Sequence, residues 1–293
     1  MIIVKILGGL GNQMLQYAFY KALIHRGIEA KIDISGFKNY KLHNGYELER
    51  VFGVKPNYAT LDECYKLGMP KIDFLNRVIN RIKRELGIVC SNDSYYEQSI
   101  EETMQYLPQM FKVDKDMYLF GYWNSYKYFE DIYNEVIEDF RFKNEFDDKN
   151  KKIQEKIEKC NSVSIHVRRG DYLDFDIYKN ICDKEYYEKA IKYISARVER
   201  PAFFIFSNDI MWCKKNLEIK DATYIEGNNG GNSYKDMQLM SLCKHNIIAN
   251  STFSTWGGYL NRNKDKIVCA PSLFLNLPAD QEDVFPPGWI KIN

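Results

Sequence analysis

Residues 2–35 read IIVKILGGLGNQMLQYAFYKALIHRGIEAKIDIS, and their pattern specifies the class of fold. Residues 2–7 are apolar apart from one lysine and are rich in β-branched side chains, which is typical of a buried strand. Apolar residues then recur at helical spacing from Leu15 to Leu23, and a second strand is predicted over 29–35. This strand–helix–strand order is the unit from which parallel sheets are built.

The second half of the chain shows the same alternation of strands and helices. The expected strands are 162–167, 202–207, 222–227, 246–250 and 266–271, and the expected helices are 184–198 and 233–245. This order predicts a doubly wound α/β domain, whose ligands bind at the carboxyl ends of the strands.

A charged, glycine-free segment at 143–160 separates the two halves. We place a domain boundary near residue 148, which divides the chain into an N-terminal α/β domain, 1–148, and a C-terminal α/β domain, 149–293. Residues 36–145 contain helical patches and many aromatic side chains, and no element order is predicted for them.

Composition excludes several classes of protein. The chain has 41 basic and 40 acidic residues, whereas dedicated nucleic-acid binders usually have a strong basic excess. Its seven cysteines contain no Cys-x-x-Cys pair, which indicates free thiols in a reducing compartment. With no signal peptide or membrane-spanning run expected, we predict a cytoplasmic protein. The amphipathic segment 74–86 is predicted to be either a surface helix or a peripheral contact with the cytoplasmic face of a membrane.

Every unusual motif follows an expected strand. The first is GGLGNQM (8–14), and HVRRGDY (166–172), SND (207–209) and NSTFSTWGG (250–258) follow strands of the second half. We expect these four loops to line a crevice between the two domains.

Arg168 and Arg169 provide fixed positive charge at the end of a strand. An arginine presents five donors in a rigid fork and binds phosphate bidentately. We expect no metal, because the four histidines do not cluster and the Asp-x-Asp triplets at 114–116 and 174–176 are of a kind that arises by chance. The alternative role for the arginines is a salt bridge between the domains.

The glycine loop also allows more than one interpretation. Glycines such as Gly11 let the backbone approach a phosphate, and Asn12 and Gln13 add side-chain donors at the start of a helix. Met14 replaces the third glycine of a dinucleotide fingerprint, although Asp33 is at a plausible distance for its acidic residue. A tight turn is the remaining alternative.

The hydroxyl-rich loop offers a similar choice. Thr252, Ser254 and Thr255 could bind phosphate oxygens or cap a helix. Ser233 and Asp236 have the spacing of a capping box, in which Ser233 caps the helix and Asp236 bonds back to it.

Taken together, these motifs resemble those of the bacterial α1,2-fucosyltransferases, glycosyltransferase family 11. HVRRGDY is similar to the first motif that this group shares with other fucosyltransferases. The further similar stretches are GGLGNQMLQYA, FSND, DMQLMSLCKHNIIANSTFSTWGGYL and FPPGW. The resemblance runs from residue 5 to about residue 289 and is weak over 36–145.

The resemblance implies a fold, a reaction and partners. The fold would be GT-B, with two facing Rossmann-like domains, the C-terminal one binding the donor and the N-terminal one the acceptor. The reaction would be inverting transfer of L-fucose from GDP-β-L-fucose to the 2-hydroxyl of a terminal β-galactoside of a glycan, without a metal or other cofactor. The product would belong to carbohydrate biosynthesis, as in O-antigen or capsule.

The resemblance also implies site residues. Arg168 would hold the β-phosphate and stabilise the charge that develops on it, and Asp236 would read the guanine. The donor-binding set is Gly11, Asn12, Gln13, His166, Arg168, Asn208, Asp209, Asp236, Thr252, Ser254 and Thr255. Asp171 is our candidate general base, and Arg169, Tyr172 and Trp256 are expected to be structural or to line the cleft.

Two rival classes of function remain open. A dinucleotide-dependent oxidoreductase is supported by the opening strand–helix–strand unit, and NAD(P) binding without GDP binding would favour it. A glycan-binding protein without activity, built on a transferase fold, would bind β-galactosides and never turn over GDP-fucose.

Overall fold

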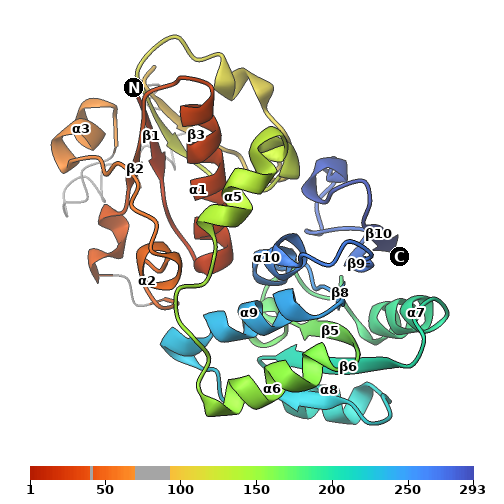
Figure 1. The fold of residues 1–293 in the computed structure, drawn as a ribbon. Helices are drawn as coiled ribbons and strands as arrows, with labels where there is room; N and C mark the ends of the chain where they lie inside the picture. Colours follow the sequence, from red (N-terminus) through yellow and green to blue (C-terminus); the bar gives the residue numbers. More distant parts are fainter. Residues whose placement is uncertain (40–41, 70–92) are drawn as a thin grey trace.

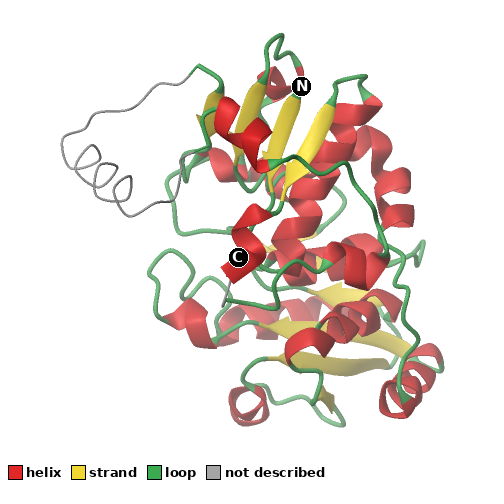
Figure 2. Cartoon of the chain, turned by 90° about the vertical axis from the view of Figure 1, so that its left-hand side faces the viewer, coloured by secondary structure: helices red, strands yellow, loops and turns green. Residues whose placement is uncertain are grey.

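The computed structural model describes residues 1–39, 42–69 and 93–293. Figure 1 shows two α/β bodies, one above the other, with the N-terminus in the upper one and the C-terminus at the edge of the lower one. Each body contains its own sheet, and Figure 2 shows the two sheets as separate groups of strands.

The upper sheet is parallel and has the strand order β2-β1-β4-β3 among the described residues. Its strands are β1 (Ile2–Lys5), β2 (Ala30–Asp33), β3 (Tyr95–Glu97) and β4 (Met117–Phe120). The helices that the structure describes in this half are α1 (Leu10–His25), α2 (Leu48–Phe52), α3 (Leu61–Lys66) and α5 (Tyr133–Asp139), with short 3₁₀ turns η1 (Ser35–Asn39), η2 (Glu102–Met104), η3 (Pro108–Phe111), η4 (Tyr126–Tyr128) and η5 (Glu130–Ile132).

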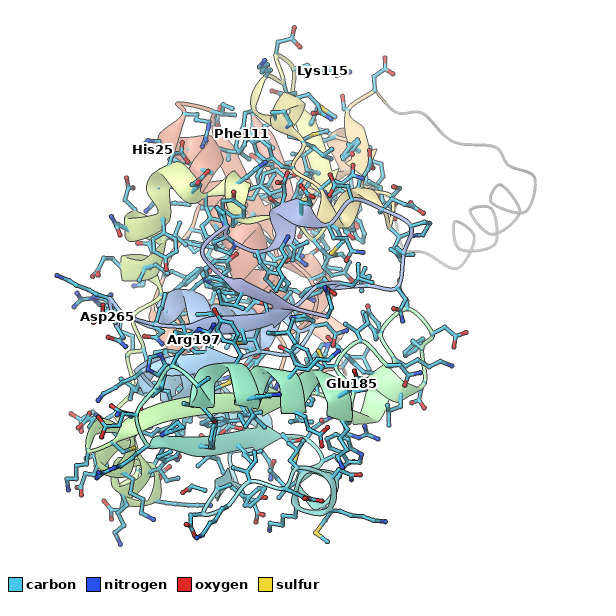
Figure 3. The ribbon with its side chains drawn as sticks, turned by 90° about the vertical axis from the view of Figure 1, so that its right-hand side faces the viewer. His25, Phe111, Lys115, Glu185, Arg197 and Asp265 are labelled. Atoms are coloured by element: carbon cyan, nitrogen blue, oxygen red, sulfur yellow. The ribbon has the colours of Figure 1, made fainter. Side chains whose placement is uncertain are left out.

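The lower sheet is also parallel, with the order β10-β9-β8-β5-β6-β7. Its strands are β5 (Asn161–Val167), β6 (Pro201–Ser207), β7 (Thr223–Ile225), β8 (His245–Ile247), β9 (Val268–Pro271) and β10 (Ile290–Ile292). The helices are α6 (Asp148–Glu158), α7 (Lys184–Ser195), α8 (Ile210–Asn216), α9 (Tyr234–Leu242) and α10 (Thr252–Leu260), with turns η6 (Gly170–Leu173), η7 (Gly230–Asn232) and η8 (Glu282–Val284). Figure 3 shows α7 lying across this sheet, with Glu185 near its start and Arg197 just beyond its end.

The strand order puts β5 at a topological switch point. The chain passes from β5 to β6 and β7 on one side of the sheet and later returns to place β8 on the other side. In open parallel sheets a ligand binds in the crevice outside the carboxyl ends of the strands at such a point. The crevice is therefore expected beside the residues that follow β5 and β8.

One apolar core runs through both halves at the junction. Trp256 of α10 is fully buried, and its ring lies 5.5 Å from that of Phe129 and 5.0 Å from that of Phe140. The Tyr133 hydroxyl also donates a short hydrogen bond to the carbonyl oxygen of Tyr259. Figure 1 shows α10 beside the lower end of α1, at the contact between the two halves.

The parallel α/β order predicted from the sequence is confirmed, because each predicted strand of the second half overlaps an observed one. The strands β3 and β4 come from 36–145, for which the sequence predicts no order. All upper strands precede residue 121 and all lower strands follow residue 160, and the boundary near residue 148 stays our proposal. The amphipathic segment 74–86 lies outside the described residues. Of the helices that the structure describes, none is long and apolar enough to span a bilayer.

Candidate active site at the strand ends

The loops after β5 and β6 are tied to each other. The Asn208 side chain accepts a hydrogen bond from the Arg169 backbone N–H at 2.9 Å and donates one to the Arg169 carbonyl at 3.1 Å. Gly170 has a φ of +60°, and a Cβ there would lie 2.8 Å from Asn208 Nδ2. Asn208 therefore shapes the arginine loop from the neighbouring strand end.

Arg169 is held by groups of its own domain. Its Nε lies 3.5 Å from Asp209 Oδ2, and its guanidinium carbon lies 4.2 Å from the ring centre of Trp212. Asp209 also caps α8 by accepting from the Trp212 N–H at 3.0 Å. For Arg169 the alternative of a salt bridge between the domains is wrong, because β6 lies next to β5 and brings an acid of the same domain.

Arg168 lies at the edge of a small pocket. Its guanidinium carbon is 5.2 Å from the ring centre of Tyr172, which stacks on Tyr178 at 4.5 Å. Arg168 and Tyr172 line this pocket with Asn250, which follows β8. The arginine is half-buried at the switch point, where its charge is poorly screened by solvent.

Asp171, the candidate base, belongs to η6, directly after the two arginines. The placement of its side chain lies outside what the structure describes. Its role therefore remains a prediction.

His166, in β5, is buried and lies beside the loop after β8. Its ring centre is 5.8 Å from that of Phe253. Burial, and to a lesser degree the nearby charge of Arg168, lowers the pKa of His166 to about 3. The imidazole is therefore neutral near pH 7, and its buried Nδ1 has no hydrogen-bond partner within the described residues.

The glycine loop of the upper half packs directly on the start of α10. The Trp256 Nε1–H donates to the Gly11 carbonyl at 3.0 Å, and the Thr252 hydroxyl donates to Asn12 Oδ1 at 2.8 Å. A Cβ on Gly11 would lie 2.6 Å from the Thr252 carbonyl carbon and 2.7 Å from Phe253 N. Gly11 is thus required by contact with another part of the chain, and Trp256 is structural.

Replacing Gly11 by alanine should lower both the melting temperature and the turnover. The added methyl group meets rigid backbone, and overpacking of this kind costs about 1–3 kcal/mol, offset in part by the better helix propensity of alanine. Thermal unfolding and initial rates measure the two effects. Gly9→Ala is the matched control, because a Cβ there meets its nearest atom at 3.4 Å. Equal melting temperatures for the two variants would contradict the close contact.

Three of the predicted donor-binding side chains are occupied inside the protein. Gln13 is fully buried, donates to the carbonyls of Gly8 and Gly45 and accepts from Glu47 N–H. The hydroxyls of Ser254 and Thr255 are buried and bond to the backbone around Ser251. These groups already have partners and are shielded from solvent, and their contact with the donor stays a prediction.

The backbone N–H groups at the start of α10 offer another way to bind a phosphate. Ser251, the N-cap residue, makes no side-chain capping bond. The first N–H groups of a helix lack partners within the helix, and they favour an anion. For this loop, backbone N–H groups are better phosphate donors than the hydroxyls of Ser254 and Thr255.

Asp236 lies in the first turn of α9 and is half-buried. Ser233, at the N-cap, makes no capping bond with its side chain, so the capping-box alternative is wrong. Asp236 Oδ1 instead accepts from Asn228 Nδ2 at 2.7 Å. Burial raises the pKa of Asp236 to about 7, although the Asn228 hydrogen bond and the charge of Lys149 act in the opposite direction.

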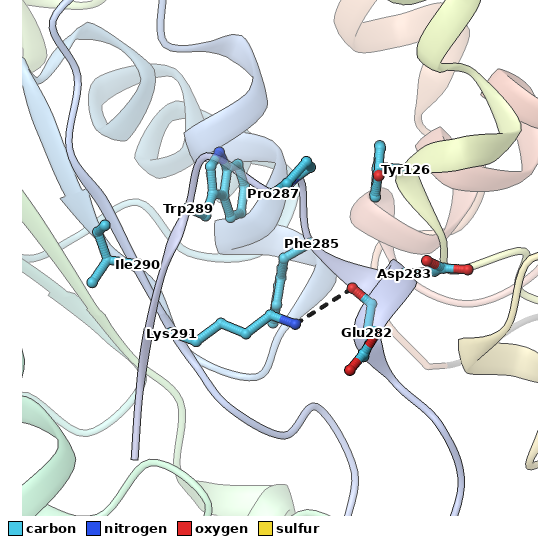
Figure 4. Close-up of a pocket in the computed structure, with 8 residues that line it drawn as sticks. All are labelled: Tyr126, Glu282, Asp283, Phe285, Pro287, Trp289, Ile290 and Lys291. Atoms are coloured by element: carbon cyan, nitrogen blue, oxygen red, sulfur yellow. Dashed lines mark hydrogen bonds between the residues drawn. The ribbon is translucent and has the colours of Figure 1, made fainter.

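A second pocket, of about 460 Å³, lies between the C-terminal segment and η4. Figure 4 shows Lys291, whose Nζ donates to the Glu282 carbonyl at 3.5 Å, and Tyr126 on the opposite side. Lys127 and Asp283 form an ion pair of 2.6 Å beside it. These contacts tie the C-terminal segment to the upper half, away from the residues predicted for the site.

Comparison with known proteins places the chain in a family. The model of glycosyl transferase family 11 matches residues 71–293, well over half of the chain. The chain belongs to this family.

Two relatives of this family 11 protein align over nearly all of its length. It is 33% identical to an alpha-1,2-colitosyltransferase of Escherichia coli, over 99% of this chain and 98% of the relative. It is 25% identical to the galactoside alpha-(1,2)-fucosyltransferase 2 of Hylobates lar, over 99% of this chain and 78% of the relative. The family assignment leaves the oxidoreductase alternative without support.

A solved structure confirms the fold. The family 11 protein aligns with the NodZ alpha-1,6-fucosyltransferase, whose crystals were soaked with GDP-fucose, over 88% of this chain and 91% of that one. The TM-score is 0.50 at 15% sequence identity. The predicted GT-B architecture is therefore confirmed at the level of the fold.

Sequence reasoning missed several residues of this family 11 protein that hold the site together. Asn44 donates to the Ser233 hydroxyl at 3.2 Å, and Arg50 donates to the Gly231 carbonyl at 2.8 Å, so α2 and the turn before it contact the start of α9. Asn228 is a third such residue. Its signal in the sequence is the glycine- and asparagine-rich composition of 227–232, which indicates a loop and no particular contact.

Proposed function

We propose that the protein transfers L-fucose from GDP-β-L-fucose, with inversion, to the 2-hydroxyl of a terminal β-galactoside. The observation that carries the proposal is the arginine loop after β5, which lies at the switch point of a family 11 chain beside the start of α10. The α1,2 linkage is supported by the names of the two relatives that align over nearly all of this chain, an alpha-1,2-colitosyltransferase and a galactoside alpha-(1,2)-fucosyltransferase.

Arg168 would stabilise the leaving group in this reaction. The bond between fucosyl C1 and the phosphate oxygen breaks through an oxocarbenium-like state, and negative charge builds on the β-phosphate. A positioned donor is worth most where charge develops in a site shielded from water. Asn208 and Asp209 act indirectly by fixing the loop that carries Arg168.

The acceptor hydroxyl would attack C1 from the face opposite the departing GDP and form the new C1–O bond. Its proton would pass to Asp171 or to solvent, since a loose transition state needs little help from a base. The acceptor would bind against the upper half, within residues 36–145.

A second donor is favoured by one comparison. The Escherichia coli relative is named as a colitosyltransferase, and colitose is fucose without its 3-hydroxyl. A site that hydrogen-bonds a substrate hydroxyl rejects the analogue lacking it by about 10⁴–10⁵-fold. The ratio of kcat/KM for the two GDP-sugars therefore decides between them.

The deciding experiment incubates the protein with GDP-fucose or GDP-colitose and a panel of β-galactosides, followed by linkage analysis of the products. Fucosyl transfer in α1,2 linkage is the expected result. Transfer from GDP-colitose alone would change the donor, and galactoside binding without turnover of either donor would identify a glycan-binding protein.

Turnover should be unchanged in excess EDTA, because we propose that Arg168 supplies the positive charge that a metal provides in other transferases. Initial rates with and without chelator measure this. In the triplet 174–176, Asp176 is ion-paired with Lys179. Loss of activity on chelation, restored by magnesium or manganese, would show that a metal takes part.

A further inference from the structure

Asn228 and Asn150 form a reciprocal pair of amides beside Asp236. Asn228 Nδ2 donates to Asn150 Oδ1 at 3.0 Å, and Asn150 Nδ2 donates to Asn228 Oδ1 at 3.0 Å. Both residues are buried, with exposed fractions of 9% and 1%. The second Nδ2–H of Asn228 is therefore directed to one place, Asp236 Oδ1 at 2.7 Å.

This pair is anchored at the start of α6. Asn150 Nδ2 also lies 3.1 Å from both carboxylate oxygens of Asp147, the N-cap residue of α6. Asp147 accepts from Asn150 N–H at 2.9 Å and pairs with Lys235 at 2.7 Å. A chain of hydrogen bonds therefore runs from the α6 cap to Asp236 and joins segments that are distant in the sequence.

We propose that Asn228 is a positioning residue for donor recognition: it holds the Asp236 carboxylate in the orientation that receives the nucleobase and supports its charge by a hydrogen bond. This inference rests on the proposed function and deepens it. A guanine base presents two parallel donors, N1–H and N2–H, which match two carboxylate oxygens. Adenine lacks both donors, so a fixed carboxylate would be left unpaired.

The charged groups around Asp236 determine how much the Asn228 hydrogen bond contributes to its ionised form. Of the groups packed around Asp236, Lys149 on α6 provides the positive charge that acts on the carboxylate, and Lys235 is engaged by Asp147. On the side of α2, Arg50 is paired with Glu47. The sequence of α10 carries no acid or strong base. The Asn228 hydrogen bond is therefore a main factor that favours the ionised form.

The sign of the pH effect follows from these contacts. Because burial places the pKa of Asp236 at about 7, the carboxylate becomes protonated as the pH falls below neutrality. A protonated acid offers guanine fewer acceptors, so GDP should bind more weakly at pH 6 than at pH 8. Removing a hydrogen bond to the charged form raises a pKa further.

The test measures GDP binding to the full chain by calorimetry between pH 5.5 and 9. In Asn228→Ala, we expect the midpoint of the pH dependence to move upward by about one pH unit, equivalent to about a fivefold loss of affinity at pH 7 that approaches tenfold at lower pH. Asn228→Ser, which restores a donor, should recover part of the shift. Asn44→Ala is the control, because Asn44 contacts the start of α9 through Ser233 and not through Asp236.

The outcomes separate this inference from the proposed guanine contact. If Asp236→Asn keeps the wild-type affinity and pH profile, the guanine contact itself fails. If Asp236→Asn abolishes the pH dependence but Asn228→Ala leaves the midpoint and affinity unchanged, Asn228 has no positioning role. Should Asn228→Ala not fold, Asn150→Ala removes the anchor alone and is expected to shift the midpoint in the same direction.

Discussion

Replacing Arg168 by lysine should lower turnover by about two orders of magnitude or more while the protein stays folded. Lysine keeps the charge but loses the bidentate fork, and one contact to a developing oxyanion is worth about 3–4 kcal/mol. The effect should fall on kcat more than on KM, since the charge on the β-phosphate appears as the bond breaks. Steady-state kinetics with GDP-fucose and thermal unfolding measure the two consequences separately.

The adjacent residue is the control for this experiment. Arg169→Lys weakens the contact with Asp209 and the stacking on Trp212, so its main expected effect is on the melting temperature. Near-normal turnover for Arg168→Lys, or a larger loss of turnover for Arg169→Lys, would show that the wrong arginine has been placed at the phosphate.

Replacing Asp236 by asparagine should raise the KM for GDP-fucose by about ten- to a hundredfold, because a buried group left without its partner costs about 1–3 kcal/mol. Asparagine keeps one acceptor, which Asn228 can still reach, and turns the other oxygen into a donor that opposes guanine. Discrimination between GDP and ADP in competition assays should weaken at the same time.

The melting temperature of this variant should change little. Since folding raises the pKa of Asp236 from 3.8 to about 7, stability falls as the pH rises from 3.8 to about 7, and the full cost of the carboxylate is present above that pH. Asp236→Asn should therefore be at least as stable as the wild type at pH 8. A variant that melts much earlier, binds GDP normally and still rejects ADP would show that Asp236 is structural and that guanine is read elsewhere.

The order of strands and helices and the positions of the four motif loops follow from local patterns in the sequence. Residues 2–35 predict β1, α1 and β2, because a β-branched run, a helical apolar period and a second strand are each defined by neighbouring residues. The placement of Arg168 after a strand is equally local. Motifs that follow parallel strands must gather at one edge of a sheet, so the motif order alone predicts a crevice there.

The contacts of each loop residue, in contrast, are set by tertiary packing. Strand order brings Asp209 to Arg169, so the ion pair of Arg169 lies within one domain and not between the two. The packing of α10 on the first loop explains Gly11, and burial explains why Gln13, Ser254 and Thr255 bond to neighbouring groups of the chain. These contacts join residues up to 245 positions apart. Sequence spacing specifies the face and the period of each element, whereas partners at such separations depend on how the elements pack.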